Sequence, residues 1–133
     1  MNPTGRHWTI DVNVCGRPLT LNGVHKMHPI AATKARHIWR DAATYLARAA
    51  RIPAIAGMDV EVQAHYPNRA HWADIDGTAI TVKGIIDGIV LAGVVPDDSP
   101  RWFHRLTILS PVLSPGDPAG IVVRVIEVSD ADA

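Results

Sequence analysis

Apolar and polar residues alternate along two separate segments of this chain. The first is Trp8–Val14 and the second is Met58–Ala64, and in each every second residue is apolar. A period of two is typical of a strand with one buried face. Phe103–Leu109 and Ile121–Val128 are also apolar and rich in β-branched residues, and a stretch containing several Pro and Gly separates them. We therefore expect these two runs to form a terminal hairpin.

Two other segments carry apolar residues at helical spacing. Ala31–Arg51 has its apolar stripe at Ala35, Ile38, Trp39, Ala42, Tyr45, Leu46 and Ala49. Thr78–Ala92 repeats the pattern with Val82, Ile85, Ile86, Ile89 and Val90. Pro53 and Gly93 lie where they would end these helices. Residues 15–30 contain several turn formers and predict a loop.

The predicted order is strand, helix, strand, helix, strand, strand. This order favours an α/β or α+β fold in which two main helices pack on a small mixed β-sheet of about four strands. At 133 residues the chain has the length of one domain, here residues 1–133. We expect frayed ends at about residues 1–6 and 129–133.

Composition excludes some classes and favours none. No apolar run reaches the length of a membrane span. Met1–Arg6 lacks a signal-peptide core, and the lone Cys15 cannot form an internal disulfide, which suits a reducing cytoplasm. The net charge is zero, yet residues 1–51 carry eight Lys and Arg against two acidic residues, and the rest of the chain has the opposite balance. Such asymmetry fits a part that grips a polyanion beside a part that grips a metal, and equally fits chance segregation of surface charge.

Acidic residues are concentrated in one stretch, from Asp74 to Asp98. Asp74 and Asp76 flank one apolar residue, so in an extended segment both carboxylates would point the same way. Lys83 and Asp87 are four residues apart on the predicted helix, and Asp97–Asp98 follows in a loop that could fold back toward Asp74. Several carboxylates gathered in one place repel one another, and a divalent cation is their natural neutraliser.

Other interpretations of the same residues stay open. Asp76 could cap the helix, Lys83 and Asp87 could form a surface ion pair, and Asp97–Asp98 could be turn residues. The segment Asp74–Thr78 also matches the motif of haloacid-dehalogenase-type phosphatases, although too few residues follow it for the parallel strands of that fold.

Two further alternatives remain. His65 and His71 could join Asp74 and Asp76 in a transition-metal hydrolase, although no second closely spaced His pair completes a zinc-type set. The chain could also be a DNA-junction-binding module without catalytic activity.

Most of the chain resembles the RusA-type Holliday junction resolvases, the crossover junction endodeoxyribonucleases of bacteria and their phages. The shared features begin with a strand, a loop with Pro and Asn (Pro18–Asn22) and a helix containing Trp39-Arg40-Asp41. They continue with a second strand and then Asp74, Asp76, Lys83, Asp87, Ala92-Gly93 and Asp97-Asp98. The interval from Lys83 to Asp98 is the most specific part. Gly77 stands where an asparagine often follows, and Lys83 lies three residues later than in the type member, almost one helical turn or about 4.5 Å.

The resemblance implies a RusA-like fold and an endonuclease that resolves four-way DNA junctions by paired symmetric nicks during recombination and repair. It implies that Asp74, Asp76 and Asp98 bind Mg²⁺, with Mn²⁺ able to substitute, and that Asp97 coordinates or orients from behind them. Lys83 would stabilise charge that develops at the phosphate. It also implies a homodimer, since a four-way junction is two-fold symmetric. The protein would act in the cytoplasm of a bacterial cell and could be encoded by the bacterium, a phage or a prophage.

Basic and aromatic residues supply candidate contacts to DNA. We expect phosphate contacts from Arg17, Lys26, Lys34, Arg36, Arg40 and Arg69. Trp72 could stack on an unpaired base or be buried. Gly84 and Gly88 form a row of small residues that would let another backbone approach, either in a partner or in the same chain.

Overall fold

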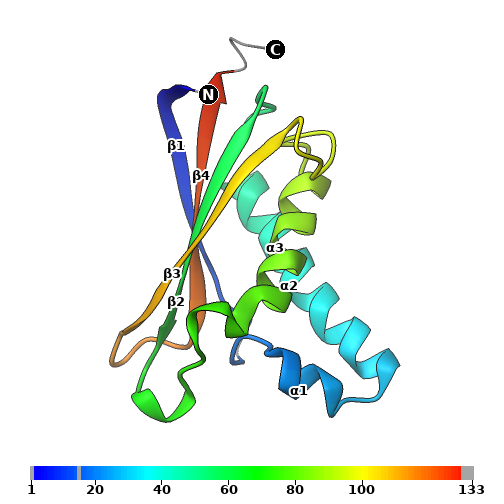
Figure 1. The fold of residues 1–133 in the computed structure, drawn as a ribbon, viewed down its shortest axis with the longest axis vertical. Helices are drawn as coiled ribbons and strands as arrows, with labels where there is room; N and C mark the ends of the chain where they lie inside the picture. Colours follow the sequence, from blue (N-terminus) through cyan, green and yellow to red (C-terminus); the bar gives the residue numbers. More distant parts are fainter. Residues whose placement is uncertain (1, 15, 130–133) are drawn as a thin grey trace.

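Four strands form one curved sheet in the order β1-β4-β2-β3 (Figure 1). The computed structural model describes residues 2–14 and 16–129, apart from the side chains of Asn2, Pro3 and His71. β4 runs antiparallel to both β1 and β2, and β3 runs parallel to β2. The strands are β1 (Asn2–Val12), β2 (Met58–Tyr66), β3 (Phe103–Leu113) and β4 (Gly120–Ser129).

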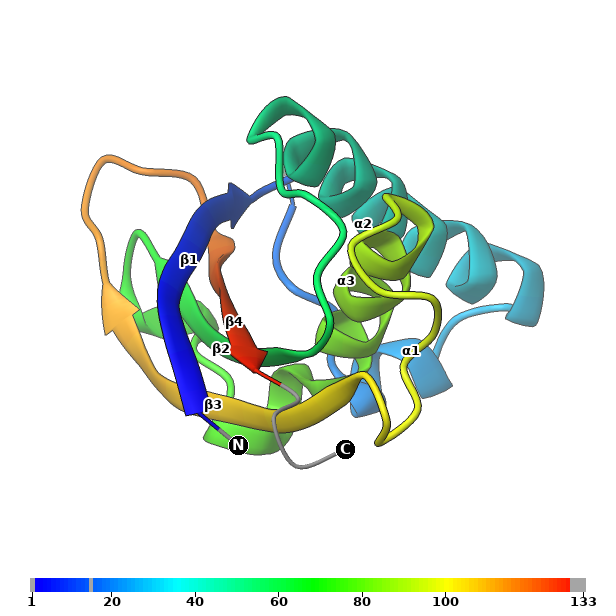
Figure 2. The same ribbon diagram turned by 90° about the horizontal axis from the view of Figure 1, so that it is seen from above.

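The two long helices cover the same face of this sheet (Figures 1 and 2). The helices are α1 (Leu21–His25), α2 (Pro29–Ala49) and α3 (Ala79–Leu91), with short 3₁₀ helices η1 (Arg69–His71) and η2 (Ile75–Thr78). This mixed four-stranded sheet with two main helices confirms the predicted fold class. Within the described residues, no helix is long and apolar enough to cross a membrane.

The expected terminal hairpin is wrong. β2 lies between β3 and β4, so the last two strands of the chain do not pair with each other. β3 instead runs parallel to β2, which requires a crossover between them. That crossover contains η1, η2 and α3. The amino-acid composition of β3 suits a strand in a hairpin equally well, because composition does not determine which strand lies beside it.

The N-terminal part of the chain is more regular than its sequence predicts. β1 begins at Asn2, and Arg6 donates to Glu127 of β4 at 2.7 Å, so residues 2–6 belong to a strand rather than a frayed end. The predicted loop contains α1, because the Thr20 hydroxyl caps it by accepting from Gly23 N at 3.1 Å. β4 includes Ser129. Cys15 and residues 130–133 lie outside the described residues.

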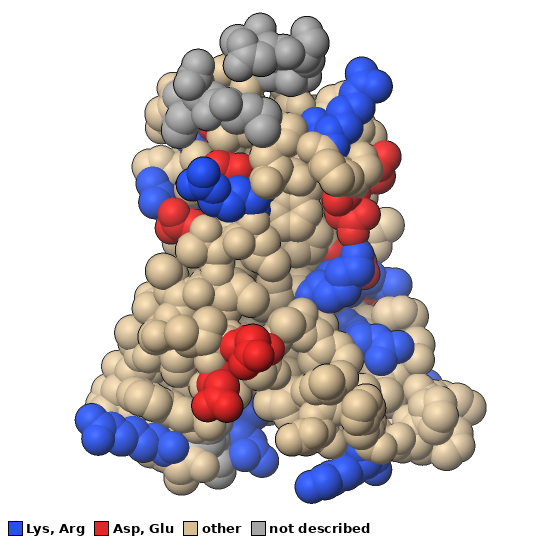
Figure 3. All heavy atoms as spheres, viewed as in Figure 1, with Lys and Arg blue, Asp and Glu red and all other residues tan. Residues whose placement is uncertain are grey.

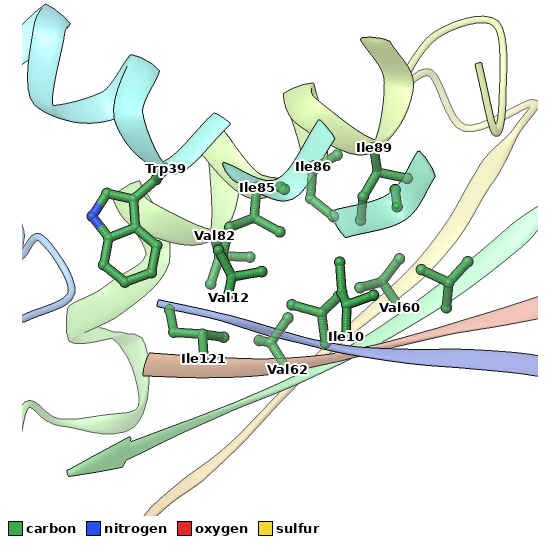
Figure 4. Packing of buried hydrophobic residues seen from close by; sticks show 14 of the residues in the cluster. Ile10, Val12, Trp39, Val60, Val62, Val82, Ile85, Ile86, Ile89 and Ile121 are labelled. Carbon is green, nitrogen blue, oxygen red and sulfur yellow. The ribbon is translucent and has the colours of Figure 1, made fainter. Parts of the chain in front are cut away.

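The core lies between the helices and the sheet (Figure 4). Fully buried side chains of α3 face those of the strands; among them are Val82, Ile85 and Ile89 on the helix and Val12, Val60, Val62 and Ile121 on the sheet. Truncating Ile85 to Ala would remove about 2–5 kcal/mol of stability, because its site is closed on all sides.

The apolar face of α2 differs from the predicted stripe. Its buried residues are Ala32, Trp39, Ala43 and Ala47. Ile38 and Tyr45, which the spacing places toward the core, are 56% and 72% exposed. Apart from Trp39, the buried residues of α2 are alanines, and the small side chain of Ala43 lies where α2 comes closest to α3.

That close approach explains the row of small residues on α3. A Cβ on Gly88 would lie 2.2 Å from the Arg40 carbonyl oxygen, and one on Gly84 would lie 3.2 Å from the Arg36 carbonyl oxygen. The Thr44 hydroxyl joins the two helices by donating to the Gly88 carbonyl at 2.8 Å. The partner of the glycine row is therefore α2 of the same chain.

Candidate functional site

Asp74 and Asp76 lie on the 3₁₀ turn that leads into α3, and we call this pair the acidic turn. The backbone N–H of Gly77 donates to the Asp74 carbonyl at 2.9 Å, so the segment is not extended as its sequence predicts. A 3₁₀ helix has three residues per turn, so side chains two positions apart, such as those of Asp74 and Asp76, point in different directions. Both side chains are exposed, and in residues 16–129 neither accepts a hydrogen bond that caps η2 or α3. The alternative role of Asp76 as a helix cap is therefore not observed.

The acidic turn is held in place by its neighbours. Tyr66 at the end of β2 is buried, which raises the pKa of its hydroxyl, and a hydrogen bond with the backbone of Ala73 opposes that rise. A Cβ at Gly77 would lie 3.0 Å from the Ala73 Cβ. Glycine therefore suits this turn, and an asparagine in its place would require the turn to shift. At the start of α3, the Thr81 hydroxyl donates to the Leu19 carbonyl at 2.8 Å.

Three of the predicted DNA contacts belong to this region. The positive charge of Arg17 also opposes the rise in the pKa of Tyr66, so this guanidinium acts on the end of β2. The Arg69 guanidinium lies 5.7 Å from the centre of the Trp72 ring. Trp72 is 40% exposed, so it is not the buried tryptophan of the alternative interpretation. Its ring remains accessible for stacking.

A second charged region lies further along α3. The Lys83 ammonium donates to Asp87 at 3.0 Å and also to Asp98. These two hydrogen bonds, with that to Asp98 the stronger influence, raise the pKa of Lys83. All three side chains remain about half exposed. The ion pair between Lys83 and Asp87 is thus present, and Asp98 joins it from the loop that follows α3.

Two neighbouring hollows between α2 and α3 lie beside Lys83, and together they form one groove. Arg36, His37, Arg40, Lys83, Gly84 and Asp87 line the first hollow. Arg40, Asp87, Val90, Leu91, Asp97 and Asp98 line the second, which continues the first through its two shared residues. We call the six charged residues Arg36, Arg40, Lys83, Asp87, Asp97 and Asp98 the charged groove. Figure 3 shows basic and acidic side chains side by side over this flank, and separate acidic side chains over the segment that leads into α3.

Asp97 lies at the rim of the charged groove. Its carboxylate accepts from the backbone N–H of Ser99 at 2.8 Å. Hydrogen bonds from the Ser99 side chain and backbone lower the pKa of Asp97. This is the turn geometry that the sequence offers as an alternative to a role in metal binding.

The predicted magnesium ligands do not form one group. Among the described residues, no three His, Cys, Asp or Glu side chains come close enough to hold a metal ion. Asp98 is bound to Lys83 and Asp97 to Ser99, whereas Asp74 and Asp76 lie on the acidic turn. The four carboxylates therefore do not form a single ligand group in this arrangement.

The remaining predicted DNA contacts are divided between surfaces. Arg36 and Arg40 line the charged groove. Lys26 follows α1, and Lys34 lies on the outer face of α2; both are exposed and neither lines the groove. The sequence therefore identified basic residues but did not show that they lie on different surfaces.

No catalytic or metal-binding role was predicted for Asp87 or His37. The spacing of four residues on a helix did predict that Asp87 lies beside Lys83, and the two side chains are in direct contact. His37 lines the first hollow together with Arg36 and Arg40; it follows Arg36 directly and precedes Arg40 by three residues, about one helical turn.

The phosphatase alternative does not fit the described sheet, and the transition-metal alternative includes a side chain that lies outside the described residues. The phosphatase fold needs a parallel doubly wound sheet, whereas the described sheet has antiparallel pairings of β4 with β1 and β2 and helices on one face. His65 contacts Asp11 at 2.7 Å through its Nε2 atom. The side chain of His71, the other histidine of the transition-metal alternative, lies outside the described residues.

Comparison with known proteins adds no family assignment. No family model matches the chain, and no curated protein matches it closely enough in sequence to be called a relative.

Proposed function

We propose that this chain is a structure-specific endodeoxyribonuclease that nicks four-way DNA junctions, as its resemblance to RusA-type resolvases implies. The observation that carries the proposal is the Lys83 ammonium, held between Asp87 and Asp98 at an exposed groove. The interval from Lys83 to Asp98 is also the most specific part of the resemblance. The spacing in the sequence and the contacts in the structure thus involve the same three residues.

The charged groove supports a role in gripping a phosphate. Arg36 and Arg40 are half-buried against α3, which limits the motion of their side chains and places them beside Lys83. Cations held in fixed positions bind phosphate oxygens with less loss of conformational entropy than freely moving ones. Asp87 and Asp98 position the ammonium, which would face the negative charge that develops on the phosphate during hydrolysis.

The acidic turn would face the same substrate from the other end of α3. Arg69 and Trp72 precede Asp74, so a cation and a stacking surface accompany its carboxylate. Hydrolysis adds a water oxygen to phosphorus and breaks the bond to the 3′-oxygen, which leaves as a hydroxyl. The resemblance assigns Mg²⁺ to this reaction, and this remains a prediction because the described carboxylates do not form a ligand group.

The test is incubation of the purified protein with a labelled four-way junction, with Mg²⁺ and with a chelator. We expect paired nicks that require Mg²⁺ and are lost by at least about 100-fold in Asp74→Asn. Asp59→Asn, an acidic residue on the sheet rather than in either charged region, is the matched control and should stay active. Full activity of Asp74→Asn, or no nicking by the unaltered protein, would refute the proposal.

Two outcomes would instead support the alternatives. Junction binding that is unaffected by metal, without strand cleavage, would indicate a non-catalytic binding module. Turnover of a small phosphate ester without cleavage of DNA would favour a phosphatase.

A further inference from the structure

A hollow of about 350 Å³ lies between the short helix α1 and the loop that precedes it. We call it the α1 hollow, and its lining residues are Arg17, Pro18, Leu19, Thr20, Gly23 and Met27. Pro18 is buried and forms the base, whereas Arg17 and Met27 are exposed at the rim. None of these residues belongs to the acidic turn or the charged groove. The volume is at the lower end of the range of small-molecule sites, so it suits one small group.

Hydrogen bonds hold the walls of the α1 hollow in place. The Thr20 hydroxyl accepts from the Gly23 N–H at 3.1 Å, and the Leu19 carbonyl accepts from the Thr81 hydroxyl at 2.8 Å. Thr81 is buried on α3 and Leu19 packs against the core, so the second contact joins the loop to the interior of the molecule. A hollow that is already formed binds a ligand with less loss of conformational entropy than one that must close around it.

The residues of the α1 hollow offer three kinds of contact. Pro18, Leu19 and Met27 are apolar, and the thioether of a methionine makes favourable contacts with aromatic rings. The Thr20 hydroxyl can donate its proton to a polar atom at the edge of a ring. The Arg17 guanidinium suits phosphate oxygens, because its donors form a planar fork. An aromatic ring with polar edges and an adjacent phosphate is the chemistry of a nucleotide.

The charges around the α1 hollow favour an anion. Residues 12–40 contain five Lys and Arg and no acidic residue. Within this stretch, Lys26 is exposed next to Met27 at the rim. A positive potential of this kind attracts a phosphate, whereas an uncharged ligand gains nothing from it. The charges therefore favour a nucleotide over an apolar molecule of the same size.

The α1 hollow lies near the acidic turn. Its residue Leu19 is bonded to Thr81 at the start of α3, and η2 with the acidic turn leads directly into that helix. The charge of Arg17 acts on Tyr66, which makes a hydrogen bond with the backbone of Ala73, the residue before the acidic turn. Figures 1 and 2 show α1 beside the segment that leads into α3. A DNA strand bound at the acidic turn would therefore have the hollow nearby.

We propose that the α1 hollow binds one unpaired nucleotide of the DNA, with the base against Leu19 and Met27 and its phosphate on Arg17. The inference rests on the proposed function, since it takes branched DNA as the substrate, and it adds a binding site outside the acidic turn and the charged groove. Base pairs at the centre of a four-way junction lack a continuous stack, so a base leaves that place more easily than it leaves a regular duplex. Capture of this base would hold the strand while a neighbouring phosphate lies at the acidic turn.

A four-way junction with 2-aminopurine at its centre tests base capture, with a chelator in place of Mg²⁺ so that no strand is cut. The fluorescence of 2-aminopurine is low in a base stack and rises when the base leaves it. We expect this rise when the unaltered protein binds. Met27→Ala removes one wall of the hollow, so the rise should be largely lost and the junction should bind roughly tenfold more weakly.

Leu21→Ala is the matched control, because Leu21 is an exposed apolar residue of α1 that does not line the hollow. It should give the full rise in fluorescence. Far-ultraviolet circular dichroism should show unchanged folding for both variants, since both side chains are exposed. No rise with the unaltered protein, or the same rise in Met27→Ala as in Leu21→Ala, would overturn the inference.

A second measurement separates the base from the phosphate. The full-length protein is titrated with a deoxynucleoside 5′-monophosphate and with inorganic phosphate, and its amide signals are followed by ¹H–¹⁵N NMR. The nucleotide should shift the signals of residues 19–27, and inorganic phosphate should shift them much less. Arg17→Met should weaken binding of the nucleotide by roughly tenfold, whereas Arg105→Met, which changes an exposed arginine of β3, should not.

Three results of this titration would overturn the inference. The first is an absence of shifts in residues 19–27, and the second is equal shifts from the nucleotide and from inorganic phosphate. The third is unchanged binding of the nucleotide by Arg17→Met.

The inference and the proposed function fail in different ways. Nicking with Mg²⁺ by a protein that produces no rise in fluorescence contradicts base capture alone. A rise in fluorescence without nicking contradicts the nuclease proposal alone. A protein that binds the mononucleotide at the α1 hollow but binds no junction would have a free nucleotide as its ligand, which overturns the assignment to DNA.

Discussion

The carboxylates of the acidic turn and those of the charged groove lie at successive positions of one crossover, yet they differ in how they are neutralised. In the groove, Lys83 binds Asp87 and Asp98, and Asp97 accepts from Ser99. On the turn, Asp74 and Asp76 have exposed side chains without a cap interaction among residues 16–129. Carboxylates with internal partners help to define the local structure, whereas those without them are left for an external cation or donor. Under the proposed function, the carboxylates of the groove would position Lys83, and those of the turn would act on the substrate.

The largest expected effect comes from breaking the groove while leaving the turn in place. Gly88→Ala puts a methyl group 2.2 Å from the Arg40 carbonyl oxygen, so α2 and α3 must separate. We expect a loss of about 2–3 kcal/mol in the free energy of unfolding, measured with urea, even after the better helix propensity of alanine is included.

Gly84→Ala is the matched control for that variant. Its methyl group would lie 3.2 Å from the Arg36 carbonyl oxygen, a contact that a small shift relieves. We expect a change of less than about 1 kcal/mol. Equal losses from the two variants would show that the close contact at Gly88 does not determine how α2 packs on α3.

Much of this architecture follows from local pattern, and the parts that do not follow depend on contacts between distant residues. Alternation in Met58–Ala64 and helical spacing in Thr78–Ala92 predicted β2 and α3 well, because each element buries one face. The pairing of β3 with β2 was missed because it depends on the crossover and not on the composition of the strand.

The candidate site was predictable to a similar extent. The contact of Lys83 with Asp87 follows from a spacing of four on a helix. The contact of Lys83 with Asp98 was not predicted, because the loop that carries Asp98 was expected to return toward Asp74. The geometry of Asp74 and Asp76 did not follow, since a hydrogen bond from Gly77 converts the expected extended segment into a turn. The sequence also could not show that α2 exposes Tyr45, because the spacing of apolar residues does not tell which of them face α3.

Replacing Lys83 should lower the rate of junction nicking and leave the free energy of unfolding nearly unchanged. Lys83→Met is expected to reduce junction nicking by roughly 100-fold, because charge developing on the phosphate loses a fixed cation. Unfolding should change by less than about 1 kcal/mol, since the ion pairs of Lys83 are largely exposed.

Arg105→Met serves as the control for Lys83→Met, because it removes an exposed cation of β3 that lies outside the groove. It should nick junctions at the normal rate. Loss of stability without loss of nicking in Lys83→Met would assign this lysine a structural role alone.

The smallest expected effect concerns the rim of the groove. The pKa of Asp97 is lowered in the folded state by Ser99, so its contribution to stability is present above the unfolded pKa of about 3.9 and is lost as pH falls through the folded pKa. Ser99→Ala should raise the pKa of Asp97, as followed by carboxyl ¹³C NMR, while Ser99→Thr keeps the hydroxyl and the low value. An unchanged pKa in Ser99→Ala would remove the Ser99 side chain as its cause.

The central claim is that the acidic turn and the charged groove act on one phosphate, and a double-mutant cycle on junction nicking tests it most directly. Rates would be measured for the unaltered protein, Asp74→Asn, Lys83→Met and the double variant under the same salt and Mg²⁺. Residues that act together in one step show strongly non-additive effects. We predict that the double variant is about as slow as the slower single variant. Losses that multiply, or full activity of Asp74→Asn, would contradict the claim.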